Sequence, residues 1–580
     1  MGDEHAKERV AAMTSMTPEQ AVRHLVENDP TFAVHEVDIR GVTVKAFKNI
    51  PSNVPALLKV GWARHGEGQW DYLEYLDESY TYADFTASVN RMAHALREDL
   101  NLKQGDRVGV VMRNYPELLM LILAISSMGG VVVLLNAWWT ADELAYALGD
   151  SEVDVVFADG PRMQRLTPIC EKRPLTIVGV RDAEGLGDRD FSTLRDGAKS
   201  EAAPEITIEA EDDFMIVYSS GTTGDPKGVI LTHRGAMNAV FSWLLQATVP
   251  AVMNPPAPDA PQGPRPSVLV VTPLFHVTAT HPLFLLSLPT GAKITLMHKW
   301  NAGDAVHMIR DNQITRMLGV PTQSADLMEA ARAMGESLPM LDYIGTSGAK
   351  RPAAQVAQIN NTFPNAVIAT GWGMTETNAL GIGLTGDAYV ADPDATGRLI
   401  PPVQELKLVD DDGNEVPQGE IGEIIVKGPH VMRSYLNKPE ATAEVLKEGW
   451  LHTGDLAAMD ETGCLTIHDR KKNIIIRGGE NIACLDVEGA LHQHPDVLEA
   501  VVFSVPHDRL GETVGAAIQM RPGTSVSEAE MAEFLKQHLA KFKIPTHLWT
   551  QSEPLARGTT DKIDRRVIRA ACLQKEEALA

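Results

Sequence analysis

The segment Tyr218–Val229, YSSGTTGDPKGV, contains the residue types that bind phosphate groups. Glycines let the backbone approach an anion closely, and backbone N–H groups, hydroxyls and an ammonium group can all donate hydrogen bonds to it. No G-K-[ST] triplet closes the segment, because Lys227 follows Pro226 and precedes Gly228, and this excludes a Walker A loop. The segment therefore predicts a nucleotide-phosphate site of a rarer kind.

The neighbouring residues bear on a plainer interpretation of this segment as a flexible surface loop. Met215–Val217 are apolar and predict a short buried strand that leads into the loop. A surface loop would explain the glycines, but it would not explain the pair Thr222 and Thr223 beside a lysine. The phosphate-binding interpretation is favoured, and other motifs in the chain can test it.

Five more motifs follow along the chain. They are PLFHV at 273–277, GWGMTET at 371–377, GWLHTGDLA at 449–457, DRKKNIIIRGGENI at 469–482 and TTDKIDRR at 559–566. Together with the phosphate loop they resemble, in content and order, the motifs of adenylate-forming enzymes. This family includes acyl-CoA synthetases, the adenylation domains of peptide synthetases, and luciferases. The resemblance extends from Tyr80 in YTYADF to Arg569 and covers nearly the whole chain.

The resemblance implies an α/β fold with two domains. A large N-terminal domain of layered, mostly parallel sheets with helices is expected at 1–471, and a small mobile α+β domain with the catalytic lysine at 472–580. Lys472 matches the hinge position of the family. The sequence itself alternates strand and helix patterns, which is typical of α/β layers. We expect a helix at 84–99 and strands at 107–112, 154–159, 267–274 and 292–297.

Two stretches call for a separate interpretation. Residues 118–139 carry no charge and are long enough to span a membrane. Serines and glycines within 126–130 interrupt this stretch, so it predicts a helix that begins at Pro116, a glycine turn and a buried parallel strand. The proline-rich stretch 249–267 predicts a surface loop, to which the sequence assigns no function.

The resemblance implies a two-step reaction. A carboxylate attacks the α-phosphorus of ATP, which gives an acyl-adenylate and expels pyrophosphate, and a thiol then displaces AMP. Lys562 is expected to bridge the carboxylate and the α-phosphate, which Thr375 would also contact. Glu376 is expected to bind Mg²⁺ together with Ser219 and Thr222. The plainer alternatives are a surface lysine for Lys562 and a helix-capping glutamate for Glu376.

The resemblance also implies how the nucleotide is held. Asp455 is expected to accept hydrogen bonds from both ribose hydroxyls, and Arg470 to contact the same sugar. Trp372 stands where the family usually has tyrosine, and it keeps an aromatic ring at the adenine pocket. The ATP- and AMP-binding residues expected are Ser219, Ser220, Gly221, Thr222, Thr223, Lys227, Thr346, Ser347, Gly348, Ala349, Thr370, Gly371, Trp372, Gly373, Thr375, Asp455, Arg470 and Lys562.

Two further positions bear on the rate and on the second step. Asp561 stands beside Lys562 where the family usually has glycine, and we expect this acidic neighbour to slow adenylation. The glycines Gly478 and Gly479 are expected to line the channel for the CoA pantetheine arm once the small domain has rotated.

The PLFHV motif indicates the class of acid. Peptide-synthetase adenylation domains usually have an aspartate in this region that pairs with the amino group of an amino acid. Here the neighbours of His276 are apolar, which favours an acid without an α-amine: a fatty, aryl or alicyclic acid. His276 itself is expected to flank the acyl carbon during thioester formation, with a core histidine as the alternative. The candidate tunnel residues are Phe241, Leu245, Thr278 and Gly381.

Composition is consistent with a large enzyme acting on small molecules. The chain has 580 residues, of which 44% are apolar, and its net charge of −25 without a basic tail argues against nucleic acid or an anionic membrane as a partner. The four cysteines lie far apart and are expected to be reduced thiols. No signal peptide or known address is recognised at the termini, so a cytoplasmic location without a transmembrane segment is expected.

The sequence thus predicts an ATP-dependent, AMP-forming acyl-CoA ligase that uses ATP, Mg²⁺ and CoA. The runner-up is an acyl-adenylate ligase that loads a separate carrier protein, and a homodimer is also left open. A nucleotide-binding scaffold without activity is disfavoured, because the following residues are all present: Thr222, Lys227, Glu376, Asp455, Arg470 and Lys562. A luciferase-like oxygenase shares the motifs and is not excluded by them.

Overall fold

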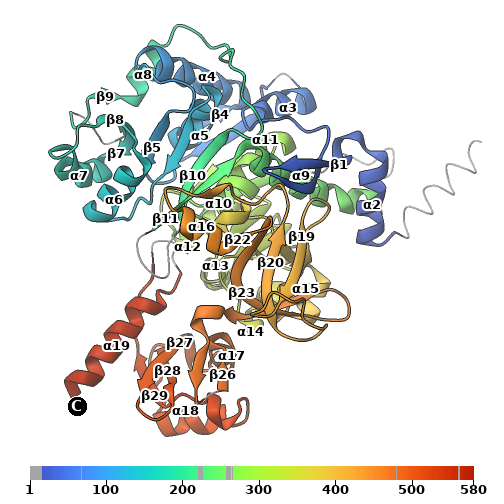
Figure 1. Cartoon of the computed structure of the whole chain (residues 1–580), viewed down its shortest axis with the longest axis vertical. Coiled ribbons are helices and arrows are strands. Elements are labelled where there is room, and N and C mark those ends of the chain that lie inside the picture. Colours follow the sequence, from blue (N-terminus) through green and yellow to red (C-terminus); the bar gives the residue numbers. More distant parts are fainter. Residues whose placement is uncertain are drawn as a thin grey trace, which may run out of the picture.

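The computed structural model describes residues 16–579 except 67, 182, 184, 220–225, 256–262, 264, 479 and 559–561. Within these residues the chain forms a large N-terminal domain and a small C-terminal domain, which lies below the large one in Figure 1. At the N-terminal end, a helix and a hairpin pack beside the long helix α9 (His233–Met253). These elements are α2 (Pro18–Asn28), β1 (Val34–Ile39) and β2 (Val42–Phe47), and α3 (Ala56–His65) follows them.

The first large sheet has eight strands, and its central strands are parallel. In spatial order they are β21 (Ser434–Tyr435), β11 (Lys227–Thr232), β10 (Asp213–Ser219), β6 (Val131–Leu134), β5 (Arg107–Val111), β7 (Val155–Asp159), β8 (Thr176–Val180) and β9 (Arg189–Asp190). The helices of this part are α4 (Tyr82–Glu98), α5 (Pro116–Ser127), α6 (Ala141–Ser151), α7 (Gly160–Cys170) and α8 (Phe191–Gly197).

The second large sheet has nine strands, with a parallel centre and antiparallel strands at both edges. In spatial order they are β18 (Arg398–Leu399), β17 (Ile382–Thr385), β16 (Val367–Trp372), β15 (Tyr343–Ser347), β14 (Arg316–Gly319), β12 (Ser267–Val270), β13 (Lys293–Leu296), β3 (Asp71–Tyr75) and β4 (Glu78–Thr81). The associated helices are α10 (Val277–Ala279), the π-helix η2 (Thr280–Leu285), α11 (Leu286–Thr290), α12 (Ala302–Asp311), α13 (Pro321–Met334), α14 (Ala353–Thr362) and α15 (Asp387–Ala391).

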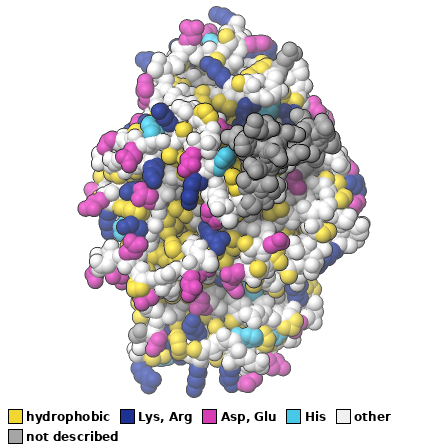
Figure 2. All heavy atoms as spheres, turned by 90° about the vertical axis from the view of Figure 1, so that its right-hand side faces the viewer, with side chains coloured by type: hydrophobic (Ala, Val, Ile, Leu, Met, Phe, Trp, Pro, Cys, Tyr) yellow, Lys and Arg dark blue, Asp and Glu magenta, His cyan; other side chains and the backbone are white. Residues whose placement is uncertain are grey.

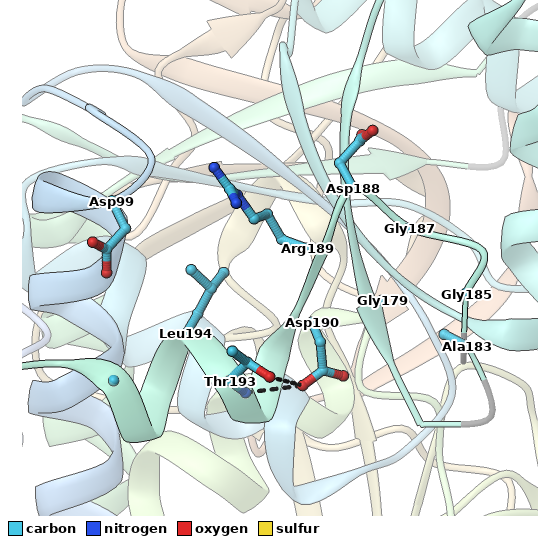
Figure 3. A pocket seen from close by; sticks show the side chains of 11 residues that line it. Asp99, Gly179, Ala183, Gly185, Gly187, Asp188, Arg189, Asp190, Thr193 and Leu194 are labelled. Atoms are coloured by element: carbon cyan, nitrogen blue, oxygen red, sulfur yellow. Dashed lines mark hydrogen bonds between the residues drawn. The ribbon is translucent and has the colours of Figure 1, made fainter.

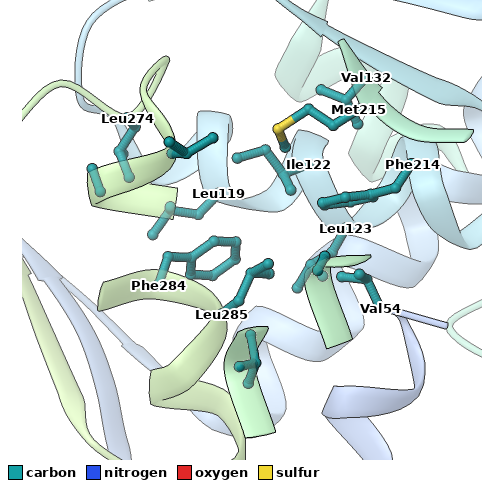
Figure 4. Packing of buried hydrophobic residues seen from close by; sticks show 14 of the residues in the cluster. Val54, Leu119, Ile122, Leu123, Val132, Phe214, Met215, Leu274, Phe284 and Leu285 are labelled. Atoms are coloured by element: carbon teal, nitrogen blue, oxygen red, sulfur yellow. The ribbon is translucent and has the colours of Figure 1, made fainter. Parts of the chain in front are cut away.

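The core of the large domain lies between these two sheets, around α5. Every residue of α5 is buried, which explains why its sequence is apolar on all sides. Figure 4 shows Ile122 and Leu123 of α5 among Phe214 of β10 and Phe284 of η2. The uncharged stretch 118–139 is thus a buried helix, a glycine turn and the parallel strand β6, as the sequence predicts.

A third sheet of five antiparallel strands completes the large domain. Its strands are β19 (Glu405–Val409), β20 (Gly422–Lys427), β23 (Trp450–Met459), β22 (Leu446–Lys447) and β24 (Leu465–Arg470), with α16 (Pro439–Val445) beside them. The sequence did not predict this sheet separately. Its strands alternate buried and exposed residues less regularly than a two-faced strand does.

The small domain has its own five-stranded sheet and its own core. Its strands are β25 (Ile475–Arg477), β26 (Glu480–Ile482), β27 (Val497–His507), β28 (Gly511–Met520) and β29 (His547–Gln551), and its helices are α17 (Cys484–Leu491), α18 (Glu528–Leu535) and α19 (Arg565–Leu579). The predicted boundary between residues 471 and 472 falls within the short helix η4 (Lys471–Asn473), and its exact position stays a prediction.

Two expectations about local structure need correction. The proline-rich stretch 249–267 is not a loop throughout, because α9 continues to Met253 with Pro250 in its last turn and Ser267 begins β12. Residues 256–262 and 264 of this stretch lie outside the described part of the chain. The strand expected at 267–274 ends at Val270, and the apolar residues that follow belong to the loop before α10.

Within the described residues, α9 is the one helix long and apolar enough to cross a membrane. It packs against α2, α11 and η2, and 56% of its most apolar stretch is buried, as in the core helix of a folded domain. The structure describes all four cysteines, and none of them forms a disulfide bond. Figure 2 shows acidic and basic side chains interspersed over one face of the molecule.

Candidate active site

The predicted motifs meet where parallel strands of both large sheets end. The phosphate loop follows β10. The segment 346–350, TSGAK, begins in the last two residues of β15, and GWGMTET begins in the last two residues of β16. Ser347 pairs with Gly371 across β15 and β16, so the second and third motifs begin side by side. Ligands of α/β proteins commonly bind at this carboxyl edge of a sheet. Ser220, Gly221, Thr222 and Thr223 lie outside the described residues, so their predicted contacts stay predictions.

Lys562 of the small domain reaches this edge. A Cβ atom built on Gly348 would lie 2.6 Å from Cε and 2.7 Å from Nζ of Lys562. Lys562 is an exposed residue overall, but the end of its side chain lies against Gly348. The pKa of Lys562 is lowered to about 8, mainly by burial of its ammonium group and then by the nearby positive charge of Arg470, while Asp455 opposes the shift. The ammonium group is therefore mostly charged at pH 7.

Asp455 is held by two donors. It is only 4% exposed, and its Oδ1 accepts from Arg470 Nε at 2.9 Å while its Oδ2 accepts from Trp372 Nε1 at 2.8 Å. Asp455 and Arg470 are direct partners across β23 and β24. The sequence predicted both residues at the sugar, but it did not predict the bond from Trp372.

Glu376 accepts a hydrogen bond from a tyrosine that the sequence analysis missed. The hydroxyl of Tyr435 donates to Oε1 of Glu376 at 2.8 Å, and Nζ of Lys227 lies 4.9 Å from the centre of the Tyr435 ring. Burial and the adjacent Glu376 raise the pKa of the Tyr435 hydroxyl, so it remains a donor. Tyr435 is in β21, which pairs with β11 beside the phosphate loop. Its place on a two-residue edge strand gave no signal in the sequence.

The carboxylate of Glu376 is a suitable ligand for a magnesium ion. Mg²⁺ is usually bound by one or two carboxylates, with substrate phosphates and water completing its shell. Glu376 is a buried carboxylate beside the phosphate loop, and the described residues contain no cluster of three metal-ligating side chains that would suit a transition metal instead. Of the other predicted ligands, Ser219 ends β10 and its hydroxyl contacts the Lys227 carbonyl at 3.4 Å, while Thr222 lies outside the described residues.

The hinge candidate Lys472 also lies close to the nucleotide motifs. Burial, followed by the positive charges of Arg470 and Lys227, lowers its pKa to about 8. Lys472 thus lies with the cations Arg470 and Lys227 in a region that also holds two acidic groups, Asp455 and Glu376. Its role as a hinge stays a prediction.

His276 is half-buried, and its ring is uncharged. Its Nε2 is buried and has no hydrogen-bond partner among the described residues. Burial and, to a smaller extent, the positive charge of Lys562 lower the pKa of His276 to about 3, which places the two side chains in one neighbourhood. The adjacent Phe275 packs on the imidazole ring at 4.7 Å between centroids.

A buried polar chain anchors the loop after Glu376, and it too was missed. Thr280 Oγ1 lies 2.8 Å from His281 Nδ1, and His281 Nε2 lies 3.0 Å from Asn378 Oδ1. Asn378 Nδ2 in turn donates to the carbonyl oxygen of His430 at 2.7 Å. His281 lies in the π-helix η2, a rare conformation that is often found at functional sites. Asn378 has φ of 51°, so the loop is held in a left-handed turn.

Other predicted residues lie near this edge or apart from it. Gly381 lies under the Trp372 ring, and Phe241 and Leu245 are buried in α9. Gly478 is at the β25–β26 turn, where its N–H donates to Leu510 of the same small domain, and Gly479 lies outside the described residues. The remaining predicted contact residues lie in the last residues of β15 and β16 or shortly after them: Thr346, Ala349, Thr370, Gly373 and Thr375.

A separate hollow lies elsewhere in the described part of the chain. It has a volume of about 600 Å³ and lies at the β8–β9 edge of the first sheet, where Figure 3 shows Asp99, Arg189 and Thr193 around it. None of the predicted site residues lines it. The hollow is therefore separate from the strand ends where the motifs meet.

Two family models match this chain and show which protein family it belongs to. The model for the AMP-binding enzyme matches residues 62–436, and the model for the AMP-binding enzyme C-terminal domain matches residues 486–558. The chain belongs to the AMP-binding enzyme family. It is an AMP-forming acid–CoA ligase, because its curated relatives are CoA ligases and synthetases.

The relatives that resemble this chain are named for different acid substrates. A feruloyl-CoA synthase of Amycolatopsis sp is 31% identical over 80% of this chain and 88% of its own length. A long-chain-fatty-acid–CoA ligase of Mycobacterium tuberculosis is 30% identical over 85% of this chain and 93% of its own. The o-succinylbenzoate CoA synthetase of Bacillus subtilis, in complex with ATP and magnesium, superposes with a TM-score of 0.73 at 27% identity, covering 88% of this chain and 99% of that structure.

Proposed function

We propose that this ligase activates a fatty, aryl or alicyclic acid without an α-amine, at the strand ends around Lys562. The observation that carries the proposal is the meeting of one ammonium group, Lys562 Nζ, with the backbone of Gly348 beside the uncharged His276. A cation at this point attracts the carboxylate of the acid. The apolar neighbours Phe275, Val277 and Ala279 are buried, and they offer no carboxylate to pair with an amino group.

In the first step, a carboxylate oxygen of the acid bonds to the α-phosphorus of ATP while the bond to the bridging oxygen of pyrophosphate breaks. Negative charge builds up on the α-phosphate oxygens and on the leaving pyrophosphate. Lys562 would stabilise the former and Lys227 the latter, because preorganised cations in a partly buried site act strongly on developing charge. Glu376 would hold the Mg²⁺ ion, which neutralises phosphate charge when bound.

In the second step, the sulfur of CoA bonds to the acyl carbon, and the bond from that carbon to the AMP oxygen breaks. The thiol loses its proton and AMP leaves as an anion. Rotation about Lys472 would carry the Gly478 turn to the site and line a path for the pantetheine arm. His276, uncharged and with a free Nε2, would lie beside the acyl carbon. A cytoplasmic location and a homodimer remain part of the proposal.

A mass-spectrometric screen tests the proposal. The protein, ATP, Mg²⁺ and CoA are incubated with panels of fatty, aryl and alicyclic acids and with amino acids as the contrasting panel, and AMP and acyl-CoA are both measured. Acyl-CoA with matching AMP from the first three panels is the expected result. Turnover of amino acids alone would contradict the substrate class. An acyl-adenylate that accumulates without thioester would indicate a carrier protein as the acceptor.

A further inference from the structure

The carboxylate of Asp455 has two hydrogen bonds before any ligand binds. Oδ1 accepts from Arg470 and Oδ2 accepts from the indole N–H of Trp372, at 2.9 Å and 2.8 Å. A carboxylate can accept about four hydrogen bonds. Each oxygen of Asp455 therefore keeps one acceptor site, and the two sites belong to a carboxylate that cannot turn without losing a bond.

The orientation of the indole is fixed independently. Trp372 ends β16 and pairs with Ile382 of β17. A Cβ atom built on Gly381 would lie 2.8 Å from Cε3 and 3.1 Å from Cζ3 of Trp372, so the six-membered ring lies directly over that glycine. With the six-membered ring placed there, the N–H on the flank of the indole points to Asp455.

We propose that Trp372 is a positioning residue, whose indole N–H sets the Asp455 carboxylate so that its two free acceptor sites receive the vicinal hydroxyls of a ribose. This inference rests on the proposed binding of ATP and adds a role that ring stacking does not provide. Stacking requires only an aromatic face, whereas this role requires a donor on the flank of the ring. The hydroxyl of a tyrosine lies at the far tip of its ring and does not replace it.

The two roles predict different responses to the sugar. If Trp372 positions Asp455, its loss weakens the recognition of the hydroxyls and leaves the rest of the nucleotide contacts in place. The preference for ATP over 2′-deoxy-ATP and 3′-deoxy-ATP then falls. If Trp372 only stacks on the base, its loss weakens the binding of all three nucleotides by the same factor, because all three carry the same base.

The test compares the wild type with Trp372→Phe, which keeps an aromatic ring and removes the donor. Binding of AMP, 2′-deoxy-AMP and 3′-deoxy-AMP is measured by calorimetry, and kcat and KM are measured with the matching triphosphates. We expect the preference for the ribonucleotide to fall about tenfold, since a hydrogen bond to a charged group is lost. KM for ATP should rise while kcat changes little. Trp372→Tyr, with the residue more usual in the family, should behave alike and guards against a folding defect in the first variant.

Trp300 provides a matched control. Its Nε1 donates to Asp326 Oδ2 at 2.9 Å, in an exposed tryptophan–aspartate pair outside the site. Trp300→Phe should leave all nucleotide preferences unchanged. Equal losses for all three nucleotides in both Trp372 variants would overturn the inference and leave the proposed function standing. A wild type that binds the three nucleotides alike would also overturn it, and one that also releases no pyrophosphate with any acid would overturn the proposed function as well.

Discussion

The side chain of Lys562 ends against the backbone of Gly348, so that a Cβ atom on this glycine would lie 2.7 Å from the lysine Nζ. The two residues belong to different domains, and the small domain therefore supplies a cation to a site built by the large one. Gly348 has φ of +85°, and a side chain there would meet both backbone strain and the lysine.

We expect Lys562→Ala to separate the two half-reactions. Without the ammonium group, formation of the acyl-adenylate should slow at least about 100-fold, as when other preorganised charge donors are removed. Conversion of supplied acyl-AMP and CoA to thioester should stay within about threefold of the wild type. Each half-reaction is followed separately by mass spectrometry. Loss of both would show that Lys562 acts on folding or on a shared step.

The rate of adenylation should fall as the pH rises above about 8. The pKa of Lys562 is lowered from its ordinary value of 10.5 to about 8, mainly by burial, and only the charged form attracts the carboxylate. The rate should therefore be near its maximum at about pH 7, fall to about half at about pH 8, and then decline toward a tenfold loss per pH unit. A pH–rate profile with saturating ATP checks this.

Lys472 has a pKa of about 8 as well, so its titration must be distinguished from that of Lys562. In Lys472→Arg the charge at the hinge position persists at high pH. The decline above pH 8 should remain in this variant if Lys562 causes it. Disappearance of the decline would assign it to Lys472.

Tyr435→Phe should weaken the response to magnesium. The hydroxyl that donates to Glu376 Oε1 fixes the carboxylate, and loss of such partners of metal ligands typically costs about 10- to 100-fold in metal affinity. The Mg²⁺ concentration for half-maximal activity should rise about tenfold. Tyr146→Phe is the matched control, because its buried hydroxyl has no hydrogen-bond partner among the described residues. An equal effect of both substitutions would contradict the role of Tyr435.

Two fully buried histidines should respond in opposite ways to replacement by leucine. Both ring nitrogens of His281 have partners, Thr280 and Asn378, whereas neither ring nitrogen of His430 has one within the described residues. His281→Leu leaves buried polar groups unpaired and should cost about 2–4 kcal/mol of stability. His430→Leu removes two unpaired polar atoms and should be neutral or stabilising.

Thermal unfolding of the two variants provides the measurement, with activity as a second readout. His281→Leu should also lower activity, because Asn378 holds the loop that carries Glu376. A greater loss of thermal stability in His430→Leu than in His281→Leu would contradict this prediction. It would show that the imidazole of His430 has a hydrogen-bond partner.

The family, the two-domain fold and the helix–turn–strand at 116–134 could be predicted from sequence, because motifs and long apolar patterns are local signals. The hydrogen bond from Tyr435 to Glu376 could not be predicted from the sequence, and neither could the one from Trp372 to Asp455. Each of these contacts joins segments that are far apart in the chain, and no spacing encodes which edge strand will lie beside which loop. The expected effect of Asp561 stays a prediction, since that residue lies outside the described part of the chain.

The pairing of Asp455 with Arg470 across one antiparallel hairpin has a consequence for the order of events. Both residues precede Lys472, and a short turn joins their strands, so a rotation of the small domain about Lys472 would not pull them apart. Lys562, by contrast, would move with that domain. A nucleotide whose ribose is bound by Asp455 and Arg470 would stay bound while Lys562 moves away from its phosphate. The intermediate would thus pass from one chemistry to the next without being released.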